Sequence, residues 1–330
     1  MKGSRRLAFV AGLIALVFVI APAAAQNAAP PSKWAPDFPL WAALWNPDFP
    51  REPTNEEPYH VPNSSETYTM KHARNLFFSP DWHPDHHPAL PDVVLNGRQP
   101  EVWACGSCHR AEGTGGPENA PIAGQPAAYI VQQMADFKSG ARMFSAPQRK
   151  PIHDMTQIGR AITDEEVQAA AAYFSALKLE PILKVVEAET IPKTVIAGLV
   201  YAKDPAGGTE PLGDRIVEMP DNLKQFEMRD SGSHFTVYVP VGSLAKGGLL
   251  VTGGAPGGVP CATCHGADLR GMGPVPGIAG RSPSYMMRQL MDFKTGARAG
   301  TWSPLMKPQI EHLSIDDMTA VVAYLASLTP

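Results

Sequence analysis

CATCHGADLRGMGPVPGIAG, residues 261–280, begins with two cysteines three positions apart and a histidine directly after the second. The same arrangement occurs once before, as CGSCH at residues 105–109. The chain has four cysteines in 330 residues, so these two motifs use all of them. One explanation must therefore account for both motifs.

The spacing C-x-x-C-H is typical of covalent haem c attachment. Two cysteines at this spacing bind the two vinyl groups of one porphyrin, and the adjacent histidine is held under the iron. A disulfide framework requires no histidine after every second cysteine, and zinc would need further Cys or His ligands at zinc spacing, which follow neither motif. The motifs therefore predict two covalently bound haem c groups, one on Cys105, Cys108 and His109 and the other on Cys261, Cys264 and His265.

The sequence after each motif also repeats. The segment IAGQPAAYIVQQMADFKSGAR at 122–142 matches IAGRSPSYMMRQLMDFKTGAR at 278–298. The two segments are 156 positions apart, as are Cys105 and Cys261. The chain thus contains two copies of one haem module. In the first copy an apolar face predicts a helix from near Pro126 to Gly140, made of Tyr129, Ile130, Gln133, Met134 and Phe137.

Each module ends in a second predicted helix with a capping signature. Thr163 with Glu166, and Ser314 with Asp317, have S/T-x-x-E/D spacing ahead of apolar runs. In so small a module, the haem itself supplies much of the apolar core against which these helices pack.

Haem iron in an electron carrier usually has a second axial ligand, and a methionine raises its potential relative to a second histidine. Met155 and Met306 are predicted to be these ligands, in loops, because each lies seven residues before the apolar residue that precedes the second helix. The alternative is that both methionines only pack in the core. Other candidate ligands are Met143, Met272, His153 and His312.

These features resemble class I cytochrome c domains, and the tandem arrangement is similar to the dihaem cytochrome c4 group. The resemblance covers under half of the mature chain. It implies all-α domains, haem held by two cysteines and a histidine with a distal methionine, and periplasmic electron transfer. The predicted fold is therefore mainly α, with two haem domains, a Pro-rich irregular N-terminal arm and a small β-containing insert.

The expected organisation has five parts. They are a signal peptide at 1–25, the arm at 26–100, the first cytochrome domain at 101–180, the insert at 181–249 and the second cytochrome domain at 250–330. The insert contains TVIAGLVYA, RIVEM and HFTVYVPVGS, runs typical of strands.

Export is predicted from the first residues. Lys2, Arg5 and Arg6 precede an apolar run from Leu7 to Ile20, and an A-x-A cleavage site follows. Cleavage would leave a periplasmic protein with no transmembrane span. It removes three of 28 basic residues and none of 32 acidic ones, so the charge changes from −4 to 25 minus 32, or −7, which argues against nucleic acid as a partner.

The arm has fourteen prolines between Pro30 and Pro100 and a tryptophan cluster of Trp34, Trp41 and Trp45. Prolines at this density oppose long helices, so we expect an irregular arm over the haem modules, with a short helix around TYTMKHARNLF. DWHPDHHP at 81–88 places His83, His86 and His87 near two aspartates, which favours a solvated turn over a copper or zinc site.

Two six-coordinate irons would leave no open position for a substrate. The predicted function is therefore single-electron transfer between a donor dehydrogenase or respiratory complex and an acceptor. The alternatives are a dihaem redox enzyme, either peroxidase-like or acting on small sulfur compounds, and a cytochrome that mainly anchors a larger complex. A cysteine-ligated iron is disfavoured because no cysteine lies outside the haem motifs.

Overall fold

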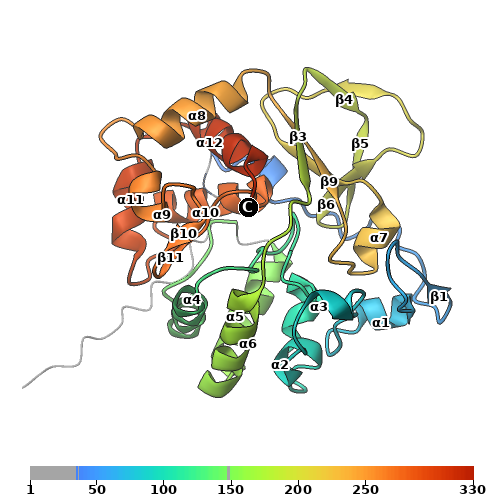
Figure 1. Cartoon of the computed structure of the whole chain (residues 1–330). Helices are drawn as coiled ribbons and strands as arrows, with labels where there is room; N and C mark the ends of the chain where they lie inside the picture. Colours follow the sequence, from blue (N-terminus) through green and yellow to red (C-terminus); the bar gives the residue numbers. More distant parts are fainter. Residues whose placement is uncertain (1–34, 36, 147–148) are drawn as a thin grey trace, which may run out of the picture.

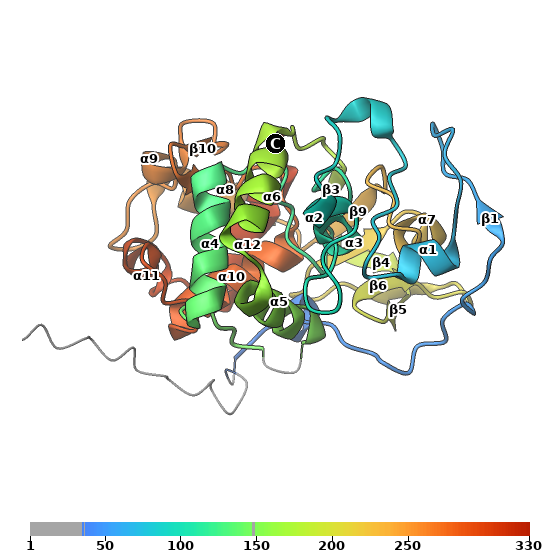
Figure 2. The same cartoon turned by 90° about the horizontal axis from the view of Figure 1, so that it is seen from below.

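The computed structural model describes residue 35 and residues 37–146 and 149–330 (Figure 1). The predicted signal peptide and Trp34 lie outside the described residues. Two helical modules lie side by side, and the strands of the insert and the arm lie against them (Figures 1 and 2). Among the helices of the described part, none is long and apolar enough to cross a membrane.

The first module is built from five helices. They are α2 (Asp92–Leu95), α3 (Cys105–His109), α4 (Ala127–Ser139), α5 (Lys150–Ala161) and α6 (Asp164–Ala176). The predicted helix after Pro126 is confirmed as α4, and it ends where Gly140 adopts φ +78°, a left-handed conformation that favours glycine. The capping box of α6 is also confirmed, since the Thr163 hydroxyl accepts from the Glu166 N–H and the Glu166 carboxylate accepts from the Thr163 N–H.

The second module repeats this arrangement. Its elements are α8 (Ser243–Gly253), α9 (Ala262–His265), β10 (Gly271–Met272), β11 (Val275–Pro276), α10 (Pro283–Thr295), α11 (Ser303–Ile310) and α12 (Ile315–Ser327). The capping box of Ser314 and Asp317 begins α12, as predicted. Helix α8 packs on α12 so closely that a Cβ at Gly247 would lie 2.0 Å from the Ala320 carbonyl oxygen. We therefore propose that the second module starts near Ser243 instead of residue 250.

Met155 and Met306 lie in helices α5 and α11, so the prediction that they lie in loops is wrong. Both helices have proline within their first turn, where it disrupts no hydrogen bond, and Pro308 lies within α11. In α5, Lys150 forms an ion pair with Asp154 one turn later, at 2.6 Å. The prolines made these segments resemble loops in the sequence.

The insert contains the predicted strands. β3 (Leu183–Glu187), β9 (Phe235–Val239) and β8 (Val217–Pro220) form a sheet in that order, with β3 parallel and β8 antiparallel to β9. The hairpin of β5 (Thr194–Ala197) and β6 (Val200–Lys203) is flanked in the chain by β4 (Thr190–Pro192) and β7 (Thr209–Pro211), which form an antiparallel pair. Helix α7 (Leu223–Glu227) precedes β9. Val237 and Val239 are fully buried in the same core as Met287 of the second module, so the sheet packs against that module.

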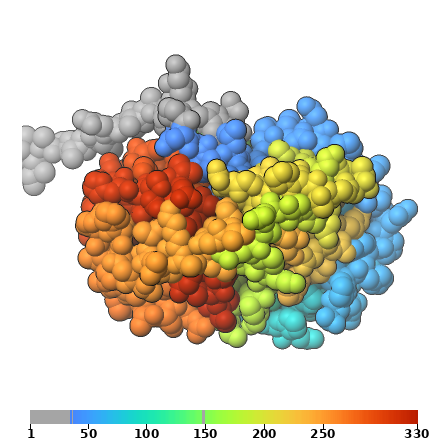
Figure 3. Space-filling model, turned by 90° about the horizontal axis from the view of Figure 1, so that it is seen from above, coloured from blue at the N-terminus to red at the C-terminus, as the bar shows by residue number. Residues whose placement is uncertain are grey.

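The arm is mostly irregular, as predicted. Its elements are η1 (Leu40–Ala42), β1 (Pro58–Tyr59), β2 (Tyr68–Thr69), α1 (Met70–Arg74), which is the expected short helix, and η2 (Pro84–His86). Trp41 packs in the same core as Met287 of α10. The buried Trp82 donates its indole N–H to the Met228 carbonyl oxygen of the insert at 2.9 Å. In Figure 3 the arm, in blue, extends from the second module along the insert.

Two of the three histidines of DWHPDHHP are not solvated, which corrects that prediction, whereas His86 is exposed as predicted. His83 Nε2 lies 2.9 Å from Asp230 Oδ1, and His87 Nε2 lies 2.9 Å from Asp81 Oδ1, with both imidazoles buried. Each histidine is thus paired with one carboxylate. Within the part of the chain that the structure describes, no group of three His, Cys, Asp or Glu side chains is placed to hold a metal ion.

Candidate haem-binding sites

The histidines of the two C-x-x-C-H motifs have the same hydrogen bond. His109 Nδ1 lies 2.8 Å from the carbonyl oxygen of Ala120, and His265 Nδ1 lies 2.8 Å from that of Pro276. A carbonyl oxygen only accepts, so Nδ1 carries the proton and Nε2 keeps a lone pair that can bind iron. Burial lowers the pKa of both histidines, which favours this neutral form.

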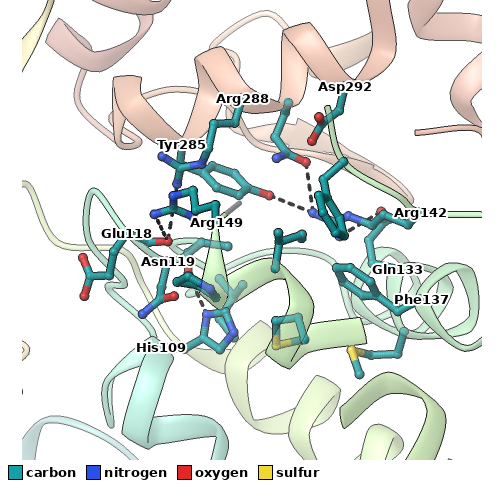
Figure 4. Close-up of a pocket in the computed structure, with 18 of the residues that line it drawn as sticks. His109, Glu118, Asn119, Gln133, Phe137, Arg142, Arg149, Tyr285, Arg288 and Asp292 are labelled. Atoms are coloured by element: carbon teal, nitrogen blue, oxygen red, sulfur yellow. Dashed lines mark hydrogen bonds between the residues drawn. The ribbon is translucent and has the colours of Figure 1, made fainter. Parts of the chain in front are cut away.

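His109 opens onto a cavity of about 900 Å³, its mouth included (Figure 4). The predicted face of α4 lines this cavity, through Tyr129, Ile130, Gln133, Met134 and Phe137. Met155 lines it too, so the predicted proximal and distal ligands of the first haem share one cavity. Met134, which sequence reasoning assigned to packing, is a second thioether on the same cavity.

Arginines form one wall of this cavity. Arg142, Arg149 and Arg288 line it, and Figure 4 shows Arg149 and Arg288 close to Glu118 and Tyr285. Within the described residues, every hydrogen bond of Arg149 and Arg288 goes to a backbone carbonyl, and Arg149 Nε is buried without a partner. Burial lowers the pKa of Arg288 to about 10, so its guanidinium stays charged at neutral pH.

This donor set fits a haem. The porphyrin is apolar and carries two carboxylates, and the cavity combines apolar side chains with guanidiniums that lack a carboxylate partner among the described residues. Buried guanidiniums are stable when they pair with carboxylates, which they bind in a bidentate manner. The orphaned Nε of Arg149 is therefore consistent with a bound propionate.

In the second module His265 is buried, Met306 is half-buried against the core, and Cys264 is exposed. The alternative ligands lie differently. Met272 is exposed on β10, His312 is exposed beside Glu311, and His153 is exposed with its ring edge-on to Phe144.

The two modules meet in a nearly symmetric network of equivalent residues, all 156 positions apart. Arg142 donates to Gln133 of its own module and to Gln289 and Tyr285 of the other. Arg298 donates to Gln289 of its own module and to Gln133 and Tyr129 of the other. The backbones of Arg142 and Arg298 also form an antiparallel bridge. Sequence reasoning missed this interface, although the repeated GAR was its signal.

The symmetry is broken by two further arginines of the second module. Arg281 donates to the carbonyl oxygens of Pro121 and Ala123, and Arg288 to that of Pro117. Their equivalents in the first module are the uncharged Gln125 and Gln132. The second module thus contributes positive charge to the loop that follows His109, and the first module returns none at these positions.

Comparison with known proteins agrees with this geometry. Residues 99–178 and 259–329 each match the family model for cytochrome c. A cytochrome c-554(548) of Halomonas halodenitrificans is 34% identical over 68 residues, which is 82% of that protein and 20% of this chain. This chain belongs to the cytochrome c family. The resemblance to tandem class I cytochromes and the mainly α fold of two such domains are thereby confirmed.

Two further relatives have descriptions that bear on function. The cytochrome c4 of Azotobacter vinelandii is 26% identical over 236 residues, or 70% of this chain and 87% of the relative. A protein of Stutzerimonas stutzeri described as a thiosulfate dehydrogenase electron acceptor is 44% identical over 83 residues, but the match spans 24% of this chain and 37% of that protein.

Among solved structures, the thiosulfate dehydrogenase TsdBA of Marichromatium purpuratum aligns with a TM-score of 0.46 and 23% identity, over 78% of this chain and 40% of that one. The cytochrome c4 of Acidithiobacillus ferrooxidans aligns with a TM-score of 0.43 and 23% identity, over 68% of this chain and 98% of that one. The family implies haem c as the cofactor, two modules fit two haems, and the protein is a cytochrome c4-like electron carrier.

Proposed function

We propose that this cytochrome is an exported, periplasmic protein that transfers single electrons between a donor dehydrogenase or respiratory complex and an acceptor, through two His/Met-ligated haems. The observation that supports this most is the matched pair of histidines, His109 and His265. Each donates from Nδ1 to a carbonyl at the equivalent position, which leaves Nε2 free for iron.

Each part of the site has a proposed role. Cys105 and Cys108 hold the first haem through thioether bonds, and His109 and Met155 bind its iron. Cys261, Cys264, His265 and Met306 do the same for the second haem. When bound, the haem supplies one-electron chemistry at its iron. The apolar wall of the cavity excludes water, and the arginines offer cations to the carboxylates of the cofactor.

The shared interface supports electron transfer between the modules. Tyr285, Arg288, Gln289 and Asp292 of the second module line the cavity of the first. The second module therefore forms part of the wall of the cavity proposed to hold the first haem. The hydrogen bonds of Arg142 and Arg298 hold the modules in one orientation, which fixes the distance between the haems.

The donor is proposed to be a dehydrogenase, and one candidate class acts on small sulfur compounds. Two relatives, from Stutzerimonas stutzeri and Thiomonas intermedia, are described as electron acceptors of thiosulfate dehydrogenase. The match with the Thiomonas intermedia protein covers 80% of that protein at 25% identity. These names support a role as an acceptor of electrons from such an enzyme.

The test is to produce the protein in cells with a c-type haem maturation system and to count haems per chain. We expect two haems, reversible one-electron reduction of each, and the weak thioether-to-iron charge-transfer band of both. Peroxide and thiosulfate should not be turned over. A high-spin haem together with catalytic consumption of either compound would overturn the carrier role and favour the dihaem redox enzyme.

A further inference from the structure

The loops that follow the two haem motifs are equivalent in sequence but differ in exposure. In the first module, every residue of 106–118 is buried except Cys108 and Glu112, which are half-buried. In the equivalent 262–274, His265 and Leu269 are the buried residues, and eight of the others are exposed, Cys264 among them. Both loops have the same histidine-to-carbonyl bond, so the difference comes from what covers them.

The arm covers one side of the first loop. A Cβ at Gly106 would lie 2.2 Å from Ser79 Oγ, so the arm lies directly on helix α3. The Ala104 N–H donates to the Leu76 carbonyl oxygen at 2.9 Å, which fixes the arm at the start of α3.

The insert covers the other side. The Glu112 N–H donates to Ser231 Oγ at 3.2 Å, and the Arg110 guanidinium lies 4.8 Å from the centre of the Phe226 ring. His83 of the arm and Asp230 of the insert join the two parts. We call arm residues 76–87 and insert residues 226–231 the cap. Figure 1 shows α3 beside the arm and below α7, and Figure 2 shows α9 and β10 at the rim of the molecule.

Backbone strain at Arg110 indicates that contacts with the cap hold the first loop in its conformation. Arg110 has φ 70° and ψ 159°, a conformation essentially restricted to glycine, and the equivalent residue of the second module is Gly266, with φ 86° and ψ 156°. Arg110 is 1% exposed, and its guanidinium lies against Phe226 of the cap and 3.5 Å from Glu118. Such strain persists where the surrounding contacts over-determine it.

We propose that the exposed loop 262–274 is the surface on which a protein redox partner exchanges electrons with this cytochrome, and that the first haem exchanges electrons with partners through the second. This rests on the proposed function. A thioether bond would fix one porphyrin edge at each second cysteine, and Cys264 is exposed at the surface. Cys108 is half-buried in the loop that the cap covers, so the cap would keep a protein partner away from this attachment site.

The occupant is a single-electron carrier protein with its own cofactor near its surface. Loop 262–274 offers what a transient interface needs, an apolar side chain among mixed charges. Met272 is 55% exposed, and Asp268 and Arg270 are exposed beside it. Ala267 lies in the middle of this loop and is exposed, whereas its equivalent Ala111 is 2% exposed beneath the cap.

The test reduces the fully haem-loaded protein in stopped flow with the same reduced flavin in two forms, one bound in a protein and one free. Flavodoxin hydroquinone is an acidic protein, and free reduced flavin mononucleotide is a small molecule. The variants are Ala267→Glu and Ala267→Lys. The matched controls are Ala206→Glu and Ala206→Lys, which make the same charge changes at an exposed alanine of the insert.

We expect Ala267→Glu to slow reduction of both haems by flavodoxin by about fivefold and Ala267→Lys to accelerate it, because rim charges act on association. The Ala206 variants and all reactions with free flavin should keep wild-type rates. The proposal is overturned if half of the haem absorbance still changes at the wild-type rate in Ala267→Glu, or if Ala206→Glu slows the reaction equally. Failure of the proposed function would appear separately, as a wild-type protein without two haems reducible by free flavin.

Discussion

A single carbonyl orients each of the two histidines proposed to bind iron, and those carbonyls belong to Ala120 and Pro276. The backbone carbonyl accepts a hydrogen bond from Nδ1–H, so the side chain of the accepting residue matters little. This explains why an alanine and a proline serve equally. The identity of the distal ligand, in contrast, depends on a side chain, and two methionines, Met134 and Met155, line the first cavity.

Met155→Ala should remove half of the thioether-to-iron band and lower the potential of one haem, because methionine ligation raises the potential. Met306→Ala should do the same for the other haem. The measurement is an optical redox titration of each variant. Met134→Ala is the matched control and should keep the full band. A band lost in Met134→Ala and kept in Met155→Ala would reverse the assignment.

Arg288→Gln should lower the potential of the first haem, because a buried positive charge favours the state that has gained an electron. Glutamine is the residue at the equivalent position 132, so the change makes the two modules alike there. Arg160→Gln, on the exposed face of α5, removes the same charge and should leave both potentials unchanged. Equal shifts in the two variants would show that only net charge matters.

Helices and strands were predictable where their signal is local. Residues a few positions apart predict the capping boxes of Thr163 and Ser314 and the apolar face of α4, and the structure confirms these features. The helices that contain Met155 and Met306 were missed; each has a proline in its first turn, and α11 has a second proline, Pro308, which weakens the local helix signal. The pairing of His83 with Asp230 joins residues 147 positions apart, and no local pattern reports such a contact.

The junction of arm and insert should weaken as pH rises. The hydrogen bond to Asp230 raises the pKa of His83, against the effect of burial. Burial lowers the pKa of His87, but its bonds to Asp81 and the Pro88 carbonyl outweigh this, so the net shift is upward. A raised folded-state pKa stabilises the fold below the unfolded value of 6.5, and this stability is lost as pH rises through the folded pKa.

Hydrogen exchange across residues 76–94 should therefore become faster above pH 6.5 than intrinsic exchange explains. His83→Gln should remove most of this pH dependence and lower the protection at acidic pH. His60→Gln, at an exposed histidine of the arm, is the control and should behave like wild type. A pH dependence that survives in His83→Gln would place its origin in His86, His87 or Glu112, which lie nearby.

As a whole, the molecule is a symmetric pair of modules made asymmetric by what surrounds them. The two haem motifs and the repeat at 156 positions made the pair predictable from the sequence. The cap was not predictable, because it combines the arm and the insert, which are far apart in the chain. Its effect is to bury the first attachment loop while the second stays exposed.

The network of Arg142 and Arg298 should make the two modules unfold together. Each guanidinium donates to both modules, and lysine, which keeps the charge, lacks the planar fork that reaches these acceptors. Arg142→Lys should therefore separate one thermal transition into two and slow electron transfer between the haems. Arg142 and Arg298 share the acceptors Gln133 and Gln289. The loss of stability in the double variant Arg142→Lys/Arg298→Lys should therefore be smaller than the sum of the losses in the two single variants. Arg270→Lys, at an exposed arginine, is the control, and a single unchanged transition in Arg142→Lys would show that the arm and insert, not this network, hold the modules together.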